Sequence, residues 1–314
     1  MSLMITKPGG QTELRQALGM LLATPELSSS VRESQVDMFC RYVQRSGLSL
    51  EHCYVARSEG TLRASCLCLD MPGRVGLVML PCGMSDPAMT GPVVRILRHL
   101  ALEAAGRGVQ FLQATLPGDA RQDFEALAGA GFQRLAELVY LECEPEKALS
   151  FARRTPVLEF LPYDDARHAQ FAEVVLATYE GSLDCGSLNG RRDIHDILAS
   201  HRGVGRFDPG LWMLGCSGGQ PVGVLLMAEL PETGDLEVVY IGLKPAFRGM
   251  GFGAALMRQA ARTAREQAAI RISVAVDSRN TPARRLYEAF GFAERFRRVV
   301  WILMLQEQGR PSAV

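Results

Sequence analysis

The chain repeats itself once, over the length of a whole domain. Its first half closes with the segment Phe124–Phe132 and its second half with Arg284–Phe292, and each runs into an apolar stretch. Superposing the two final phenylalanines gives an offset of 292 − 132 = 160 residues. At that offset the helix-like segment Val94–Ala105 falls on Ala254–Arg265. A repeat of this size predicts one fold present twice and argues against a solenoid of short repeats.

The length of 314 residues also suggests two domains. We divide the chain into a first domain at 1–146, a linker at 147–155, a second domain at 156–306 and a tail at 307–314. In the second domain, strand-like and helix-like segments follow one another in a mixed order. This order predicts an α/β (mixed α+β) fold, in which helices flank a mixed sheet.

Composition and charge argue against several classes of protein. Lys and Arg together number 34, as do Asp and Glu, so the balanced charge indicates neither nucleic-acid nor membrane binding. No apolar stretch approaches the roughly 18–20 residues of a membrane span. Met1–Gln11 lacks the pattern of a signal peptide, and the eight cysteines form no CxxC pair. We therefore expect a cytoplasmic protein with reduced thiols.

A glycine-rich loop gives the sharpest functional signal. A predicted strand at Leu236–Leu243 is followed by Arg248-Gly249-Met250-Gly251-Phe252-Gly253-Ala254, which runs straight into a predicted helix at Gly253–Gln267. Glycines permit positive φ and close approach of a ligand to the backbone. N–H groups that converge at a helix N-terminus bind anions such as a pyrophosphate, and Arg248 adds a cationic fork. The alternative is a glycine-rich turn without a ligand.

The same loop also fits a second, looser template. Gly249-x-Gly251-x-x-Ala254 matches the dinucleotide fingerprint, and Asp277 follows the next predicted strand, where a ribose ligand is expected. Two features count against a nicotinamide cofactor. Residues 244–248 separate the strand from the first glycine, and roughly 90 residues of domain precede the motif, which usually opens its domain.

Two motifs together resemble the GNAT superfamily of N-acetyltransferases. Arg248–Gly253 resembles its R/Q-x-x-G-x-G/A signature, and Val276–Phe292 resembles V-x-x-x-N-x-x-A-x-x-L-Y-x-x-x-G-F. The resemblance covers residues 156–306. It implies tandem GNAT-like domains, each with a mostly antiparallel central sheet and a splayed pair of parallel strands. In the second domain these strands would be Leu236–Leu243 and Ile270–Val276, with acetyl-CoA between them.

The resemblance also implies which residues hold the cofactor. Backbone groups of one strand would pair with the pantetheine arm like an added strand, and an N–H there would polarise the thioester carbonyl. The loop would hold the pyrophosphate, and the start of the next helix would touch the cofactor. The implied cofactor residues are Ile241, Gly242, Leu243, Arg248, Gly249, Met250, Gly251, Phe252, Gly253, Ala254, Asn280 and Ala283. For Asn280, turn chemistry remains an equal alternative, with Thr281 as N-cap and Pro282 at N1.

Two residues are candidates for the chemistry. By family analogy the Tyr287 hydroxyl would protonate the leaving thiolate, although its helical spacing also fits a core aromatic residue. Glu237 would accept the proton of an alkylamine, which is mostly protonated at neutral pH, or else it is a solvated or ion-paired strand residue. Strand alternation predicts that Tyr240 and Glu237 lie on opposite faces of the sheet.

The acceptor is not fixed by the sequence. Glu180 and Asp184 are candidates for binding a cationic amine, with a polar loop that binds nothing as the alternative. Cys185, His195 and His201 fit no standard metal spacing, so we expect no metal. Both small molecules and peptides remain possible as acceptors. The oligomeric state is also open between a monomer and a homodimer.

The first half lacks most of the loop chemistry. At the 160-residue offset Arg248 falls on Ala88, and Tyr287 falls on Leu127. We therefore expect a degenerate, non-catalytic first domain and a catalytic second domain. The predicted function is acetyl-CoA-dependent N-acetyl transfer to an amine by direct transfer. The alternatives are a non-catalytic CoA-binding or regulatory protein and, ranked below it, a nicotinamide-dependent oxidoreductase.

Overall fold

The described chain divides into two compact units that do not follow the linear order. The computed structural model describes residues 3–24, 26–84, 86–150, 154–184, 188 and 190–305. Unit 1 contains the described residues up to Leu135 together with those from Val299 on, and unit 2 contains Ala136–Arg298. The expected tail and residues 151–153 of the expected linker lie outside the described part.

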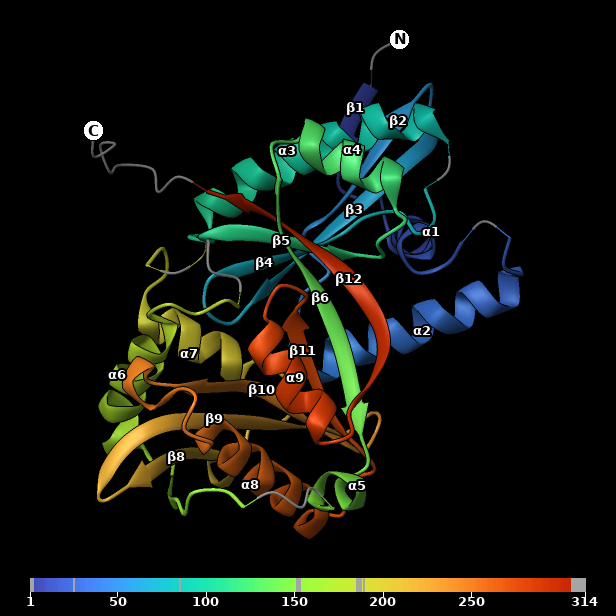
Figure 1. Ribbon diagram of the computed structural model, residues 1–314. Coiled ribbons are helices and arrows are strands. Elements are labelled where there is room, and N and C mark those ends of the chain that lie inside the picture. Colours follow the sequence, from blue (N-terminus) through green and yellow to red (C-terminus); the bar gives the residue numbers. More distant parts are fainter. Residues whose placement is uncertain are drawn as a thin grey trace, which may run out of the picture. The chain divides into compact units, whose positions relative to one another are not determined.

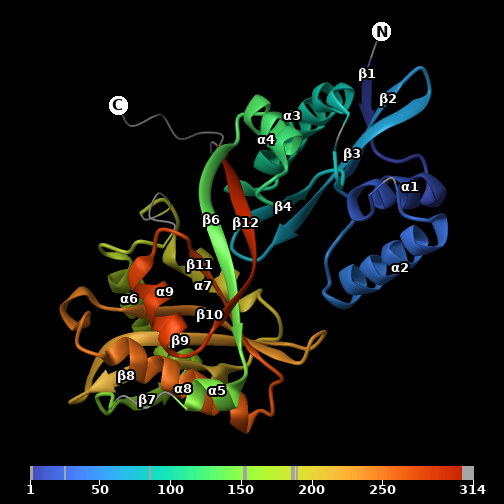
Figure 2. The ribbon, with the colours of Figure 1, turned by 45° about the vertical axis from the view of Figure 1, so that its right-hand side comes forward.

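Unit 1 is a mixed sheet covered by helices on both faces. Its strands lie in the order β1-β2-β3-β4-β5-β12. On one face α1 and α2 cover an apolar cluster that includes Leu18, Val36 and Leu67, and on the other α3 and α4 cover a second cluster (Figure 2). The elements are β1 Leu3–Thr6, α1 Gln11–Leu22, α2 Ser29–Arg45, β2 Cys53–Ser58, β3 Thr61–Met71, β4 Val75–Met79, η1 Pro87–Met89, α3 Thr90–Gly106, β5 Phe111–Leu116 and α4 Arg121–Gly129.

Unit 2 repeats this plan with strand order β6-β11-β10-β9-β8-β7. One apolar cluster packs α8 and α9 on the sheet, and another packs α6 and α7 (Figure 1). The elements are β6 Gln133–Cys143, α5 Pro145–Leu149, β7 Glu159–Pro162, η2 Asp165–Arg167, α6 His168–Tyr179, α7 Ile194–Arg202, η4 Pro209–Leu211, β8 Trp212–Ser217, β9 Gln220–Leu230, β10 Asp235–Leu243, η5 Pro245–Phe247, α8 Phe252–Glu266, β11 Ile272–Asp277, α9 Thr281–Ala289 and β12 Ala293–Met304.

The last strand of each half-chain completes the sheet of the other half. β6 pairs antiparallel with β11 of unit 2, from Cys143↔Ile272 to Leu138↔Asp277. The later part of β12 pairs antiparallel with β5 of unit 1, from Val299↔Leu116 to Met304↔Phe111. The exchange places the spatial divisions at 135/136 and 298/299, whereas the linear division was placed at 147–155.

The repeat is exact at the parallel strand pair of each unit. In unit 1, β4 pairs with β5 through Gly76↔Leu112 and Leu77↔Gln113. In unit 2, β10 pairs with β11 through Leu236↔Ile272 and Glu237↔Ser273. Each residue of a pair in unit 1 precedes its counterpart in unit 2 by 160 residues, since 236 − 76 and 272 − 112 are both 160. The mixed fold with a splayed parallel pair is therefore confirmed. Within the described residues, no helix is long and apolar enough to cross a membrane.

Candidate active site

The candidate site lies where β10 and β11 separate. Their ladder ends at Val238↔Val274, but β10 continues to Leu243 and β11 to Asp277. On its other edge, β10 stays paired with β9 as far as Leu243↔Gly223. In the described ladders, the edge of β10 that faces β11 is therefore unpaired at residues 241–243. Exposed backbone groups at a strand edge accept an extended, amide-bearing ligand.

A β-bulge in β10 changes which side chains share a face of the sheet. The register against β9 shifts between Val238, opposite Met227, and Tyr240, opposite Leu226. Glu237 lies opposite Ala228, which is two residues from Leu226 and therefore on the same face. Glu237 and Tyr240 thus share a face. The prediction that they lie on opposite faces was wrong because the bulge inserts one residue into the alternation.

The glycine loop adopts the geometry that its sequence predicts. Gly249 has φ 75° and Gly251 has φ 85°, both in the left-handed region that favours glycine. Gly251 is the N-cap of α8, which begins at Phe252, so the first-turn N–H groups of the helix lie in this loop. This arrangement of glycines and helix N-terminus is suited to an anion.

Arg248 binds the backbone in this structure. Its Nε donates to the Leu243 carbonyl at 3.1 Å, and one of its terminal nitrogens donates to the Thr178 carbonyl at 2.9 Å. The guanidinium therefore joins the end of β10 to the last turn of α6, where helix carbonyls lack intrahelical partners. Its predicted role as a phosphate ligand stays a prediction.

Tyr287 lies in α9 and is both a core residue and a candidate acid. Its side chain is 3% exposed and packs near Phe292, with ring centroids 5.7 Å apart. Burial raises the pKa of Tyr287 well above its usual value, and the charges of Asp184 and Tyr240 raise it further. The hydroxyl therefore keeps its proton at neutral pH, as a general acid requires.

The turn before α9 differs from the prediction by one residue. Asn280 is the N-cap of the helix, and its Oδ1 accepts the Ala283 N–H at 3.3 Å. The prediction of Thr281 as N-cap was wrong, because Thr281 already has helical geometry. Asn280 thus performs the turn chemistry that was one of its two interpretations.

Asp184 enters the region of the splayed strands. Its Oδ1 accepts the Asp277 N–H, at the end of β11, at 2.9 Å. Burial raises the pKa of Asp184, although the bond to Asp277 opposes this shift. Asp184 is therefore anchored to the sheet, and its role in binding an amine stays a prediction. Glu180, in contrast, is an exposed residue at the C-cap of α6.

Two hydroxyl groups that the sequence reasoning missed complete this cluster. The Thr178 and Tyr240 hydroxyl groups are 2.7 Å apart, and burial raises the pKa of Tyr240 to about 12. A Cβ on Gly242 would lie 2.8 Å from Thr178, so glycine permits the close approach of α6 to β10. The His201 ring stacks on Tyr240, and burial lowers the pKa of His201 to about 4.

Glu237 belongs to a group of side chains on one face of the sheet. It is the register neighbour of Ser273, and Tyr140 pairs with Ala275, two residues farther along β11. Burial raises the pKa of Glu237. Burial also raises the pKa of Tyr140, and the negative charge of Glu237 adds to that shift. Tyr140 stacks on Phe296, with ring centroids 4.5 Å apart and planes at 25°.

Tyr140 could not be found from the linear sequence of the second half. It lies on β6, which precedes the expected linker, and reaches unit 2 only through the strand exchange. A carboxylate beside aromatic rings suits a cationic amine, because both the charge and the ring faces attract it. The Ser273 hydroxyl is buried there without a hydrogen-bond partner among the described residues.

The described residues that a ribose or a metal site would need form other contacts. Asp277, which a nicotinamide-binding site would need for a ribose, is fully buried and forms an ion pair with Arg279 at 2.7 Å. His195 stacks on His168, and Cys185 lies outside the described residues. In the described part of the chain, no three His, Cys, Asp or Glu side chains gather as metal ligands.

Comparisons with solved structures agree with this fold. A GCN5-related N-acetyltransferase from Sphaerobacter thermophilus is 15% identical, with a TM-score of 0.62 over 97% of this chain and 96% of that one. A tandem GNAT protein from the clavulanic acid biosynthesis pathway is 13% identical, with a TM-score of 0.51 over 97% and 99%. A GCN5-related N-acetyltransferase from Kribbella flavida is 18% identical, with a TM-score of 0.51 over 77% and 87%.

A comparison with family models finds a similarity that covers the site. No match was found among curated proteins. The model of the acetyltransferase (GNAT) family matches residues 177–292, which include β10, the glycine loop and Tyr287. Residues 177–292 of this chain are therefore similar to the acetyltransferase (GNAT) family.

Proposed function

We propose that the protein is an N-acetyltransferase that moves an acetyl group from acetyl-CoA directly to an amine. The similarity of residues 177–292 to the acetyltransferase (GNAT) family supports acyl-CoA-dependent acetyl transfer in general. The observation that carries the proposal is the unpaired edge of β10 leading into a glycine loop at the N-terminus of α8. An edge for amides followed by a site for a diphosphate matches the chemistry of coenzyme A.

The cofactor would lie along the splayed strands. Backbone groups of Ile241, Gly242 and Leu243 would bind the pantetheine amides, and a backbone N–H there would polarise the thioester carbonyl. The N–H groups from Gly249 to Ala254 would bind the pyrophosphate. Arg248 would act by holding the loop against α6 through the Thr178 carbonyl, or would turn to the phosphates when they bind.

The chemical step needs two proton transfers. Glu237 takes a proton from the ammonium form of the acceptor, directly or through water, and its raised pKa brings it nearer the working pH. The neutral amine attacks the carbonyl carbon, and the new C–N bond forms as the C–S bond breaks. Tyr287 gives its hydroxyl proton to the departing thiolate. The proton that the amine loses then restores the tyrosine through the solvent.

The acceptor is proposed only as an amine. Glu237, Tyr140 and Phe296 offer a negative charge and aromatic surface on one sheet face. The tandem layout also resembles that of mycothiol synthase, but a shared fold does not fix a substrate.

Binding of acetyl-CoA is tested by thermal melting of two matched glycine variants. Gly249, with φ 75°, and Gly219, with φ 77° in the β8–β9 turn, both have open space around the position of a Cβ. Tryptophan strains the backbone equally at both positions, but only Gly249→Trp covers the loop. We expect acetyl-CoA to raise the melting temperature of the wild type and of Gly219→Trp, but not of Gly249→Trp. Equal rises in all three would refute this site.

A non-catalytic CoA-binding protein would pass that test, so turnover must be measured separately. We expect acetyl-CoA, mixed with a panel of primary amines, to release free CoA in proportion to acetylated amine. Binding of acetyl-CoA without release of free CoA in the presence of any of the amines would favour the non-catalytic alternative.

A further inference from the structure

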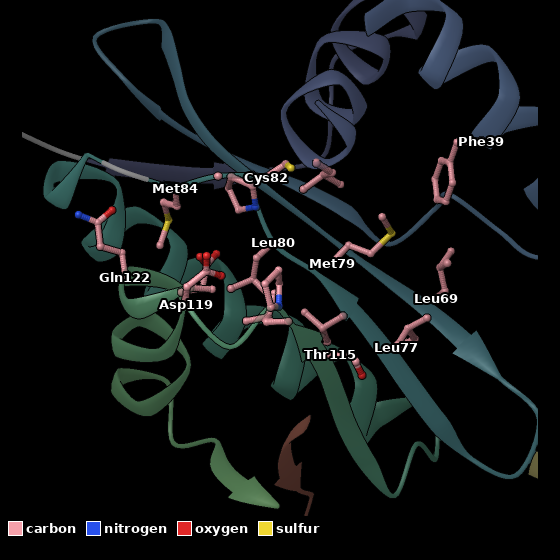
Figure 3. Close-up of a pocket in the computed structure, with 18 of the residues that line it drawn as sticks. Phe39, Leu69, Leu77, Met79, Leu80, Cys82, Met84, Thr115, Asp119 and Gln122 are labelled. Atoms are coloured by element: carbon pink, nitrogen blue, oxygen red, sulfur yellow. The ribbon is translucent and has the colours of Figure 1, made fainter. Parts of the chain in front are cut away.

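Unit 1 contains a large cavity at the place that corresponds to the active site of unit 2. The cavity measures about 830 Å³, within the range of small-molecule sites. It opens where β4 and β5 separate after Leu77↔Gln113, the counterpart of the splay between β10 and β11. Most of its lining is apolar, including Phe39, Leu69, Leu77, Met79, Leu80 and Met84 (Figure 3).

The cavity passes through the sheet. Leu77 and Met79 belong with the cluster under α1 and α2, whereas Val78 and Leu80 belong with the cluster under α3 and α4. All four line the cavity, so a ligand there touches both faces. Figure 3 shows Phe39 and Leu69 at one end of the cavity and Gln122 at the other.

This cavity lacks the features that suit a diphosphate. After β4 the chain enters η1 and then α3, whose N-cap, Met89, is helical and carries no side-chain cap. Where unit 2 has two glycines at positive φ, unit 1 has Met89 and Gly91, and Gly91 lies within α3. The charged lining residues are Asp119, Arg121 and Asp123, so acidic groups outnumber basic ones.

Asp123 is the unusual member of this lining. It lies in the first turn of α4 and is 5% exposed, although it borders the cavity. Burial raises the pKa of Asp123 to about 6, and only its own backbone N–H opposes that shift. Cys82, which follows β4, also lines the cavity, and the charge of Asp123 raises its pKa. Among the described residues, no cation forms an ion pair with it.

We propose that the unit 1 cavity binds an amphiphilic amine, whose ammonium group pairs with the Asp123 carboxylate and whose carbon skeleton lies along the apolar lining. A buried carboxylate without a cation is costly, and an ammonium ligand removes that cost while the apolar part of the ligand buries its own surface. An anionic amphiphile would bring a like charge to Asp119 and Asp123. A neutral one would leave Asp123 unpaired. This site does not depend on the function proposed for unit 2.

The test is calorimetric titration of the full chain, without acetyl-CoA, with three ligands of one shape: phenylbutylamine, phenylbutanol and phenylbutyrate. We expect the amine to bind more tightly than the alcohol and the acid. Asp123→Asn should lower the affinity for the amine by about ten- to hundredfold, which is the range for loss of one charge-assisted hydrogen bond. Asp119→Asn, a change of an exposed carboxylate on the same rim, should leave the affinity nearly unchanged.

Two further variants keep the test decisive. Met79→Trp places a larger side chain in the apolar part of the cavity and should weaken amine binding, even if Asp123→Asn proves unfolded. Glu237→Gln separates this site from the proposed acceptor site, and amine binding should survive it. Equal affinities for amine and alcohol would overturn the proposal. So would an amine affinity that is unchanged in Asp123→Asn or in Met79→Trp, or that is lost in Glu237→Gln.

Discussion

Replacing Tyr287 with phenylalanine isolates the chemistry of one hydroxyl group. The Tyr287 ring is 3% exposed, and the apolar cluster under α8 and α9 holds it in place. Phenylalanine keeps that packing and loses only the oxygen, so the free energy of unfolding should change by about 1 kcal/mol or less. A general acid contributes about 10²- to 10⁴-fold to a rate, or about 3–5 kcal/mol of barrier.

We expect the larger part of that range. The site of Tyr287 is buried, so water is a poor substitute as a proton donor, and the raised pKa keeps the hydroxyl protonated. The assay measures kcat by release of free CoA, together with the affinity for acetyl-CoA. Tyr287→Phe should lower kcat about a thousandfold or more while the affinity for acetyl-CoA stays within a few fold.

The matched control is Tyr54→Phe. Tyr54 is 5% exposed in unit 1, and burial raises its pKa too, but it takes no part in the proposed chemistry. Its variant should retain full activity. If Tyr287→Phe also retains full activity, or if it loses affinity for acetyl-CoA in proportion to kcat, the assignment of Tyr287 as the acid is refuted.

Three further predictions concern protonation and the strand exchange. Burial raises the pKa of Glu237, so the wild type should lose activity at acid pH over a range above that of an ordinary carboxyl group. Glu237→Gln should lower kcat/KM about a hundredfold and remove this loss of activity at acid pH. A variant whose activity still falls at acid pH as the wild type's does would contradict this prediction. Burial raises the pKa of Asp184 in the folded state, so its contribution to the free energy of unfolding is full below the unfolded pKa near 3.8 and falls as pH rises through the folded pKa. Urea unfolding between pH 3 and pH 7 should therefore show a smaller decline in the free energy of unfolding for Asp184→Asn than for the wild type. An equal decline in both would count against this prediction. A fragment of residues 136–298 should be more stable to urea than a fragment of residues 156–305. The second fragment lacks β6, whose buried apolar side chains contribute about 5 kcal/mol to the free energy of unfolding. The reverse order of stability would show that β6 is dispensable.

The sequence predicted features that depend on local pattern. Gly249 and Gly251, just before an apolar helix, indicate positive φ and a helix N-terminus, so the loop that leads into α8 could be placed in advance. The repeat predicted the same splayed pair of parallel strands in both halves, because equal spacing along the chain gives equal strand register.

Features that depend on long-range hydrogen bonds were not predictable. A strand pattern shows that β6 and β12 form strands, but not which sheet each one joins, and Tyr140 was missed for that reason. The bulge in β10 leaves no mark in the sequence, so Tyr240 was placed on the wrong face. Asp184 looked like part of a polar loop because its bond to the Asp277 N–H closes across 93 residues.

Mass spectrometry of acetyl-CoA mixed with a panel of amines follows the proposed transfer itself. We expect acetylated amine and free CoA in equal amounts with the wild type, and greatly slowed formation of both with Tyr287→Phe. Binding of acetyl-CoA at the glycine loop, with no acetylated product from any amine, would refute acetyl transfer by this protein.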